Sequence, residues 1–275
     1  VSTIGNQKAT NYALRANMTE AEFIKEVTDG LLPPPAYFGM NVAMNKKGYE
    51  SFETVLNHGM RAIPVAQLEL MVEETRALIL DTRNNGEFAQ GFIPQSINIG
   101  IDGDFAPWVG ALIADVKQPI ILVTPNGREE ETVTRLSRVG FDNLIGHLEG
   151  GFDAWKKAGH EMDTVNRISA EEFEKQVTIG ESKIIDIRKE SEYEAEHIED
   201  AYSKPLAYIN EWVKDINPEE HFFLHCAGGY RSMIAASILE ARGFRNFSEV
   251  EGGFNAIAKT AVPKTNFVCQ SKVLK

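Results

Sequence analysis

The chain has 275 residues, of which 43% are hydrophobic and 25% are charged, and its formal net charge is −12. Length and composition indicate a globular protein of about two domains, and the acidic balance argues against a nucleic-acid partner. No apolar run approaches the roughly 20 residues of a membrane span, and the first residues lack the apolar core of a signal peptide.

Residues 1–62 form a segment that differs from the rest. The capping box T-E-A-E that begins at Thr19 opens a helix expected to end near Gly30. The prolines at 33–35 favour an extended passage, and a second short helix is predicted near 49–56. This segment is too small for a core of its own. We expect it to be extended, mobile, or packed on the next domain or on another copy of the chain, as a homo-oligomer.

The remainder of the chain is an internal repeat with an offset of about 100 residues. ALILDTRNNGEF at 77–88 corresponds to KIIDIRKESEY at 183–193, and HLEGGFDAW at 147–155 corresponds to EVEGGFNAI at 249–257. An offset of this length indicates duplicated domains rather than a solenoid.

Each copy alternates short apolar strands with helices, which is the pattern of a parallel sheet covered by helices on both faces. The predicted strands are ALILD, PIILVT and NLIGHL in the first copy and KIIDI, HFFLH and NFSEV in the second. We therefore predict an α/β protein with two consecutive domains, over 65–162 and 166–262, and a tail over 263–275. Ligand sites of such sheets lie at the carboxyl ends of the strands.

The stretch that carries chemistry follows the strand HFFLH, after which comes Cys226. The loop residues after the cysteine are Ala227, Gly228, Gly229, Tyr230, Arg231 and Ser232, and an apolar helical pattern begins at once. Loop N–H groups and the positive end of the following helix stabilise negative charge, which favours a thiolate and a bound anion. We predict Cys226 as the nucleophile and this loop as its anion-binding site.

The spacing between the cysteine and the arginine separates two chemistries. Cysteine-dependent phosphatases resemble this arrangement, but they carry five intervening residues in a loop sized for phosphate. Here four residues intervene, and the pattern C-x-x-G-x-R-S resembles the active-site loop of single-domain rhodaneses. A buried cysteine on a core strand is the structural alternative, but it does not account for the glycines, the arginine and the helix together.

The chain resembles the rhodanese superfamily over roughly residues 65–262. The match rests on D-x-R at Asp81 and Asp186, the E-[FY] that follows each, the segment GFIPQSINI and the two EGGF motifs. The resemblance implies that the cysteine accepts a sulfane sulfur and becomes a persulfide. It also implies small sulfur anions and thiols such as glutathione as partners, with no cofactor. The acidic residues are predicted to pair structurally with arginines, Asp81 with Arg83 and Asp186 with Arg188.

The first copy departs from the family at the cysteine. It has VTPNGREE where the second has HCAGGYRS, with Arg128 in the arginine position and Val123 or Thr124 in the cysteine position. Pro125 removes a backbone donor, and the glutamates at 129–131 repel an approaching anion. We expect the first copy to be catalytically silent and to serve as scaffold or docking surface.

The second copy has a departure of its own. EHIEDA at 196–201 replaces the family's GHIPGA-like turn. This replacement puts the start of the following strand in doubt, but it does not affect the nucleophile.

The sequence contains two cysteines in unrelated contexts, Cys226 and Cys269. A disulfide framework needs more, so the sequence favours a reducing, cytoplasmic setting. Cys269 is either a resolving thiol or an incidental surface cysteine, and the second is the more common case. The chain begins without an initiator methionine, so we expect a processed or truncated piece of a longer protein.

The N-terminal segment resembles the closing tail of the metallo-β-lactamase-fold domain in bacterial fusions with rhodanese domains. Relatives of those fusions include persulfide dioxygenases, which use mononuclear iron. The metal signature of that fold, H-x-H-x-D-H, is absent, and we assign none of the six histidines to a metal. The resemblance implies that any iron or zinc belongs to a preceding domain outside this chain.

Two functions stay open on these grounds. The first is a sulfurtransferase or persulfide carrier that uses Cys226. The second is a non-catalytic interaction or regulatory module of a metallo-β-lactamase-fold, persulfide dioxygenase-like protein, which the silent first copy favours for half of the chain. A phosphatase is disfavoured by the short loop.

Overall fold

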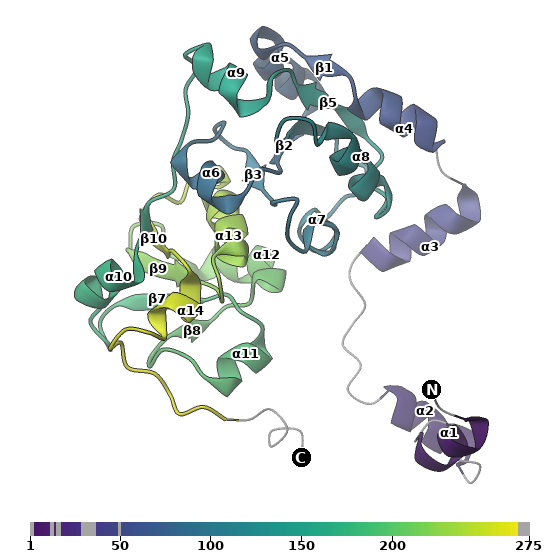
Figure 1. Cartoon of the computed structure of the whole chain (residues 1–275), viewed down its shortest axis with the longest axis vertical. Coiled ribbons are helices and arrows are strands. Elements are labelled where there is room, and N and C mark those ends of the chain that lie inside the picture. Colours follow the sequence, from purple (N-terminus) through teal and green to yellow (C-terminus); the bar gives the residue numbers. More distant parts are fainter. Residues whose placement is uncertain (1–2, 12–13, 15–17, 29–36, 49–50, 269–275) are drawn as a thin grey trace.

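In the described part of the chain, ten strands form two parallel sheets, one in each repeat (Figure 1). The structure is a computed structural model and describes residues 3–11, 14, 18–28, 37–48 and 51–268. The strand order is β1-β5-β4-β2-β3 in the first sheet and β6-β10-β9-β7-β8 in the second, so the two units share one topology. The predicted α/β class with two parallel-sheet domains is confirmed.

The strands are short, as the apolar runs predicted. In the first unit they are β1 Ala62–Ile63, β2 Leu78–Asp81, β3 Ile97–Asn98, β4 Ile120–Val123 and β5 Leu144–Leu148. In the second unit they are β6 Arg167–Ile168, β7 Lys183–Asp186, β8 Tyr202–Ser203, β9 Phe222–His225 and β10 Phe247–Val250. The central strands β4 and β9 are buried along their whole length, as expected for parallel strands covered on both faces.

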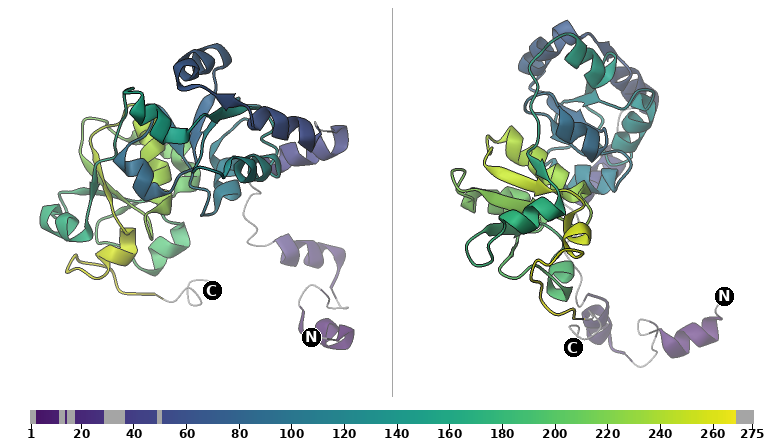
Figure 2. Two further views of the ribbon diagram at one scale, coloured as in Figure 1. Left: turned by 45° about the horizontal axis from the view of Figure 1, so that its top comes forward. Right: turned by 60° about the vertical axis from the view of Figure 1, so that its left-hand side comes forward.

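Helices cover the faces of both sheets (Figures 1 and 2). The first unit has α4 Phe52–Gly59, α5 Val65–Thr75, α6 Asn85–Gln90, α7 Phe105–Leu112, α8 Glu129–Ser137 and α9 Gly151–Lys157. The second has α10 Ala170–Gln176, α11 Glu190–Ala195, α12 Ile209–Trp212, α13 Tyr230–Ala241, α14 Gly253–Ile257 and the 3-10 turns η2 Leu206–Tyr208 and η3 Val213–Asp215. None of the helices in the described residues is long and apolar enough to cross a membrane.

The N-terminal segment contains α1 Ile4–Thr10, α2 Glu20–Thr28 and α3 Tyr37–Lys47. Helix α2 starts at the predicted capping box, because Thr19 and Glu22 exchange side-chain to backbone hydrogen bonds. Helix α3 was not anticipated from the sequence. The predicted end of α2 near Gly30 and the extended passage at 33–35 lie outside the described residues.

The first unit begins earlier than residue 65, where the sequence placed its start. Strand β1 pairs with β5, although it begins at Ala62, the last residue of the predicted segment 1–62. Helix α4 packs on α8 and β5, with Val55 buried and Gly59 against the side chain of Val133. A two-residue strand and an eight-residue helix carry too little periodicity to be assigned to a sheet that forms far along the chain.

The second unit uses part of the predicted C-terminal tail. Lys264 forms an antiparallel bridge with Ile198, and the backbone N–H of His197 donates to the Thr265 hydroxyl. Cys269 lies outside the described residues. The doubt about the strand after EHIEDA is resolved, since β8 pairs with β7 in register. Asp200 there adopts the left-handed backbone conformation (φ 61°), as Gln95 (φ 66°) does at the matching position of the first unit.

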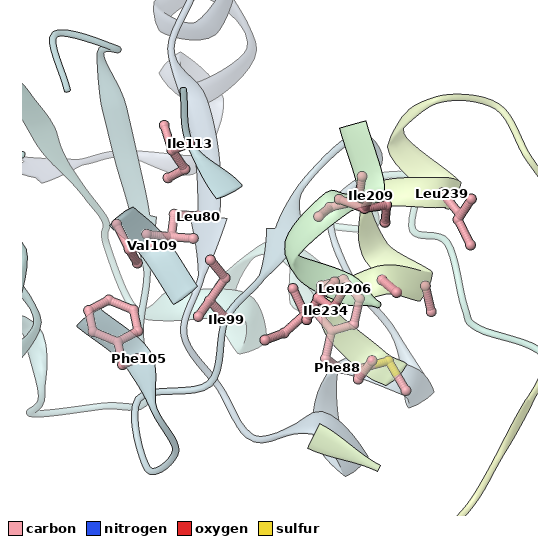
Figure 3. Packing of buried hydrophobic residues seen from close by; sticks show 14 of the residues in the cluster. Leu80, Phe88, Ile99, Phe105, Val109, Ile113, Leu206, Ile209, Ile234 and Leu239 are labelled. Carbon is pink, nitrogen blue, oxygen red and sulfur yellow. The ribbon is translucent and has the colours of Figure 1, made fainter. Parts of the chain in front are cut away.

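The two units share one hydrophobic core cluster, to which facing sides of both sheets contribute (Figure 3). Helix α13, which follows the cysteine loop, packs on β3 of the first unit. The backbone N–H of Asn98 on β3 donates to the Ser237 hydroxyl on α13 over 2.9 Å, and both residues are buried. The helix behind the candidate nucleophile is therefore held by the neighbouring repeat.

Candidate active site

Cys226 lies directly after β9 and ahead of α13, at the carboxyl edge of the second sheet. The Gly229 N–H donates to its sulfur over 3.1 Å, and the Ser232 hydroxyl lies 3.4 Å from the sulfur. Gly229 has a φ of 99°, a conformation that glycine adopts without strain and that aims its N–H at the sulfur. The cysteine is 1% exposed, so a negative sulfur depends on the Gly229 N–H and on the helix end.

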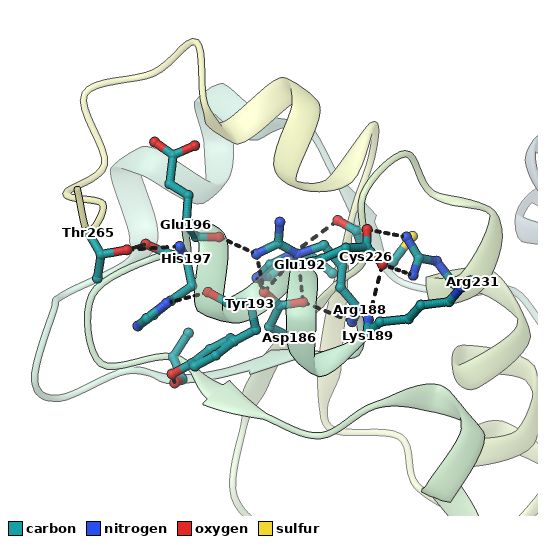
Figure 4. Close-up of polar contacts among 12 residues, drawn as sticks. Asp186, Arg188, Lys189, Glu192, Tyr193, Glu196, His197, Cys226, Arg231 and Thr265 are labelled. Atoms are coloured by element: carbon teal, nitrogen blue, oxygen red, sulfur yellow. Dashed lines mark hydrogen bonds and ion pairs between the residues drawn. The ribbon is translucent and has the colours of Figure 1, made fainter. Parts of the chain in front are cut away.

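Arg231 stands on the first turn of α13 beside the sulfur, and its head is clamped by Glu192 of α11 (Figure 4). The two Arg231 nitrogens lie 2.6 and 2.9 Å from the two carboxylate oxygens. The bidentate hydrogen bonds from Arg231 hold the pKa of Glu192 below its usual range, so the pair stays ionised at neutral pH. The sequence offered Arg231 as an anion ligand but gave no sign of this carboxylate partner.

The D-x-R motif forms a buried ion pair behind the loop. Asp186 and Arg188 lie 2.6 Å apart, and Arg188 also donates to the Glu196 carbonyl (Figure 4). The guanidinium of Arg188 lies 4.0 Å from the ring centroid of Phe254, the phenylalanine of EGGF. Asp81, Arg83 and Phe152 repeat this arrangement in the first unit. These carboxylates carry structural ion pairs and do not contact the sulfur.

The EGGF motif holds the backbone of the cysteine loop by hydrogen bonds. The N–H of Phe254 donates to the Cys226 carbonyl over 2.7 Å, and the N–H of Asn255 donates to the Ala227 carbonyl over 2.9 Å. Gly253 has a φ of 54°, and a side chain there would collide with the Cys226 backbone. Close approach of two backbones is thus the physical reason for this glycine.

A second polar chain reaches the sulfur from β10, and the sequence reading missed it. The Ser232 hydroxyl donates to Glu249 over 2.5 Å, and Arg167 of β6 donates to the other Glu249 oxygen over 2.7 Å. Both Ser232 and Glu249 are 0% exposed. The sequence signal that could have indicated it was Glu249 itself, an acidic residue within the buried strand FSEV.

The first unit contacts the cysteine loop through Tyr230. The Tyr230 hydroxyl donates to the Gly100 carbonyl over 2.7 Å, and its ring lies against Gly103, where even a methyl group would collide. Burial raises the pKa of Tyr230, so the hydroxyl keeps its proton. The role of Tyr230 in the anion-binding loop stays a prediction; its side chain is anchored in the first unit.

The register of the sheets identifies the position in the first unit that corresponds to Cys226. Asp81 pairs with Val123 as Asp186 pairs with His225, so Thr124 takes the place of Cys226. Glu129 accepts hydrogen bonds from the Thr124 hydroxyl and from the Gly127 N–H, each over 3.2 Å. A carboxylate of the protein therefore occupies the loop donor that an anion or a thiolate would need.

A pocket of about 270 Å³ opens next to this loop in the first unit, and Thr124, Asn126 and Lys156 are among its lining residues. Arg128, in the arginine position by sequence, turns away from the loop and pairs with Asp102 and Glu131. The lining of the pocket thus includes no cysteine, and the arginine that lines it, Arg83, is paired with Asp81.

Restoring only the cysteine should not activate the first unit. We expect a Cys226→Ser/Thr124→Cys protein to transfer sulfur no faster than Cys226→Ser alone, because Glu129 takes the Gly127 N–H and repels an anion. Transfer of sulfur from thiosulfate to glutathione measures this. Activity above a tenth of the unsubstituted chain would show that the first loop still binds sulfur anions.

The described residues contain no group of three or more His, Cys, Asp or Glu side chains that could hold a metal ion.

His225 precedes Cys226 and is buried. Burial lowers the pKa of His225, so its ring is neutral at neutral pH.

In comparison with known proteins, both units match the profile of the same domain family. The rhodanese-like domain profile matches residues 64–158 and 169–260. Three curated relatives match about one unit each. A rhodanese-like/PpiC domain-containing protein 12 of Arabidopsis thaliana is 31% identical over 111 residues, which are 38% of this chain and 37% of the relative. The putative sulfur carrier protein YrkF of Bacillus subtilis is 31% identical over 91 residues, 33% of this chain and 49% of the relative.

The third relative is matched over nearly its whole length. Thiosulfate sulfurtransferase GlpE of Shewanella oneidensis is 31% identical over 97 residues, 35% of this chain and 92% of the relative. The chain spans less than half of the length of the first two relatives.

Proposed function

The chain belongs to the rhodanese-like domain family, and from this premise we propose that its second unit is a sulfurtransferase that carries sulfane sulfur on Cys226. The observation that carries the proposal is the hydrogen bond from the Gly229 N–H to the Cys226 sulfur, in the loop that leads into α13. The printed names of two relatives, a thiosulfate sulfurtransferase and a putative sulfur carrier, support the same chemistry.

The proposed reaction has two steps. The Cys226 thiolate attacks the outer sulfur of thiosulfate; the new S–S bond forms as the old one breaks, and sulfite leaves with the electron pair. An acceptor thiolate, such as that of glutathione, then attacks the outer sulfur of the persulfide. Cys226 leaves as a thiolate, and the acceptor departs as a persulfide, which gives ping-pong kinetics. The reaction needs no cofactor.

Intact mass spectrometry tests the proposal. Treatment with thiosulfate should add about 32 Da, one sulfur atom, and the added mass should survive in a Cys269→Ser protein. Loss of that mass on adding glutathione would show transfer. A chain that gains nothing would favour the alternative, an interaction or regulatory module.

A specific observation supports the alternative for the first unit only. Its loop has Thr124 in place of the cysteine and Glu129 on the loop donor. We propose that this unit is a scaffold for the second. The link to a preceding metallo-β-lactamase-fold domain and a cytoplasmic setting stay predictions.

Arg231 offers a sharper test of the loop. We expect Arg231→Lys to lower transfer from thiosulfate about tenfold, because one ammonium cannot bridge both Glu192 oxygens and also face the sulfur. Steady-state rates at saturating glutathione measure this. Lys189→Arg, an exchange of the same two residue types nearby on α11's N-cap, serves as the control. Equal rates for Arg231→Lys and the unsubstituted chain would mean that the loop N–H groups suffice.

A further inference from the structure

The polar chain from Cys226 through Ser232 to Glu249 is continuous and buried. The sulfur and the Ser232 hydroxyl lie 3.4 Å apart, and Ser232 lies 2.5 Å from Glu249. All three residues are at most 1% exposed. A proton that leaves the sulfur along this path therefore does not have to enter water.

We propose that Cys226 and Glu249 share one proton through the Ser232 hydroxyl. The thiol proton passes to the Ser232 oxygen while the Ser232 proton passes to Glu249. The sulfur becomes a thiolate and the carboxylate becomes a carboxylic acid, with no change in total charge. This inference rests on the proposed function of Cys226 and names Glu249 as a positioning residue that acts on the sulfur through Ser232.

The surroundings make Glu249 a suitable acceptor. An ionised carboxylate away from water is costly, and burial raises the pKa of Glu249. Arg167 opposes that effect with one hydrogen bond of 2.7 Å, but it also faces the exposed Glu251 at 3.5 Å. Glu249 is thus held ready to take up a proton without being neutral at every pH.

The charged groups around the sulfur complete this picture. Arg231, paired with Glu192, lies on the α13 side, and the buried, neutral His225 lies on the β9 side. Asp186 of β7 is 4.0 Å from His225 and is paired with Arg188. Glu249 also has an arginine partner, Arg167, but it differs from these two carboxylates because it is hydrogen-bonded toward the sulfur through the Ser232 hydroxyl.

The silent repeat provides an internal comparison. The sheet register places His147 of β5 where the second unit has Glu249, and Ala62 of β1 where it has Arg167. The fold therefore forms without an acid and an arginine at these positions. The Glu249–Arg167 pair occurs in the unit that has the cysteine. Attachment of the first strand to the sheet does not require this pair, since β1 and β5 pair without it.

The pH dependence of Cys226 alkylation by iodoacetamide tests the proposal. Measured by intact mass in a Cys269→Ser background, it needs no sulfur donor. Two groups that share a proton titrate in two steps, so the rate should rise, level off and rise again with pH. In Glu249→Gln we expect a single step, with its midpoint about one pH unit or more below the upper step of the parent.

Glu251→Gln is the matched control, because it removes the same charge beside Arg167 without touching Ser232. It should keep both steps. One step in the parent, or two unchanged steps in Glu249→Gln, would overturn the proposal. The parent profile decides the first of these even if Glu249→Gln does not fold. If the protein gains sulfur from thiosulfate but its alkylation shows one step, only the proposal of a shared proton is refuted. A two-step protein that never gains sulfur refutes the proposed function instead.

Discussion

Cys226→Ser should abolish sulfur transfer, with a loss of more than about 100-fold, while the fold stays intact. The hydroxyl is close in size to the thiol and can keep the hydrogen bond from the Gly229 N–H. It is far less nucleophilic at neutral pH, and it cannot form a persulfide. Transfer from thiosulfate to glutathione and the mass gain after thiosulfate both measure the effect.

The matched control for this variant is Cys269→Ser, which removes the other thiol and should keep full activity. Circular dichroism and thermal unfolding should be the same for both variants. Residual transfer above a tenth of the parent rate in Cys226→Ser would remove Cys226 from its role as carrier.

Gly103→Ala should lower transfer about tenfold, although residue 103 lies in the silent unit. A methyl group at this position would overlap the Tyr230 ring, and Tyr230 is part of the cysteine loop. Relieving such overpacking costs about 1–3 kcal/mol and shifts the side chain that causes it. The backbone of Gly229 and the donors around the sulfur would move with Tyr230.

Two variants separate this effect from general destabilisation. Gly39→Ala adds the same methyl group on α3, where nothing lies within 4 Å, and should leave transfer unchanged. Tyr230→Phe removes only the bond to the Gly100 carbonyl and should cost less than Gly103→Ala. Full activity of Gly103→Ala, with an unchanged KM for thiosulfate, would show that the first unit does not position the loop.

The sheet and the place of the cysteine loop in it could be predicted because their signals are local. The strand HFFLH, the cysteine and the start of α13 are adjacent in the sequence, and the glycines between them report the loop conformation directly. The repeat helped as well, because D-x-R and EGGF occur in both copies. In each copy the arginine of D-x-R packs on the phenylalanine ring of EGGF. The helix predicted near 49–56 was assigned to the N-terminal segment, and the strand at 62–63 was not predicted, because their partners, α8 and β5, lie far along the chain.

The partners of the loop could not be predicted for a similar reason. Glu192 is 39 residues from Arg231, and Gly100 is 130 residues from Tyr230. Such contacts depend on sheet register and on how two units pack, neither of which leaves a pattern in one sequence. The position of Thr124 shows this most simply, because a one-residue ambiguity in the sequence became definite once β2 was paired with β4.

The core common to both units limits how far the first unit can diverge from the second. Leu80 and Ile99 of the first unit belong to the same buried cluster as Ile234 and Leu239 on α13, the helix that follows Cys226. A genetic screen for loss of sulfur transfer would therefore collect lesions from both halves of the gene. The first unit would look essential on such a map, although the proposed carrier cysteine lies in the second.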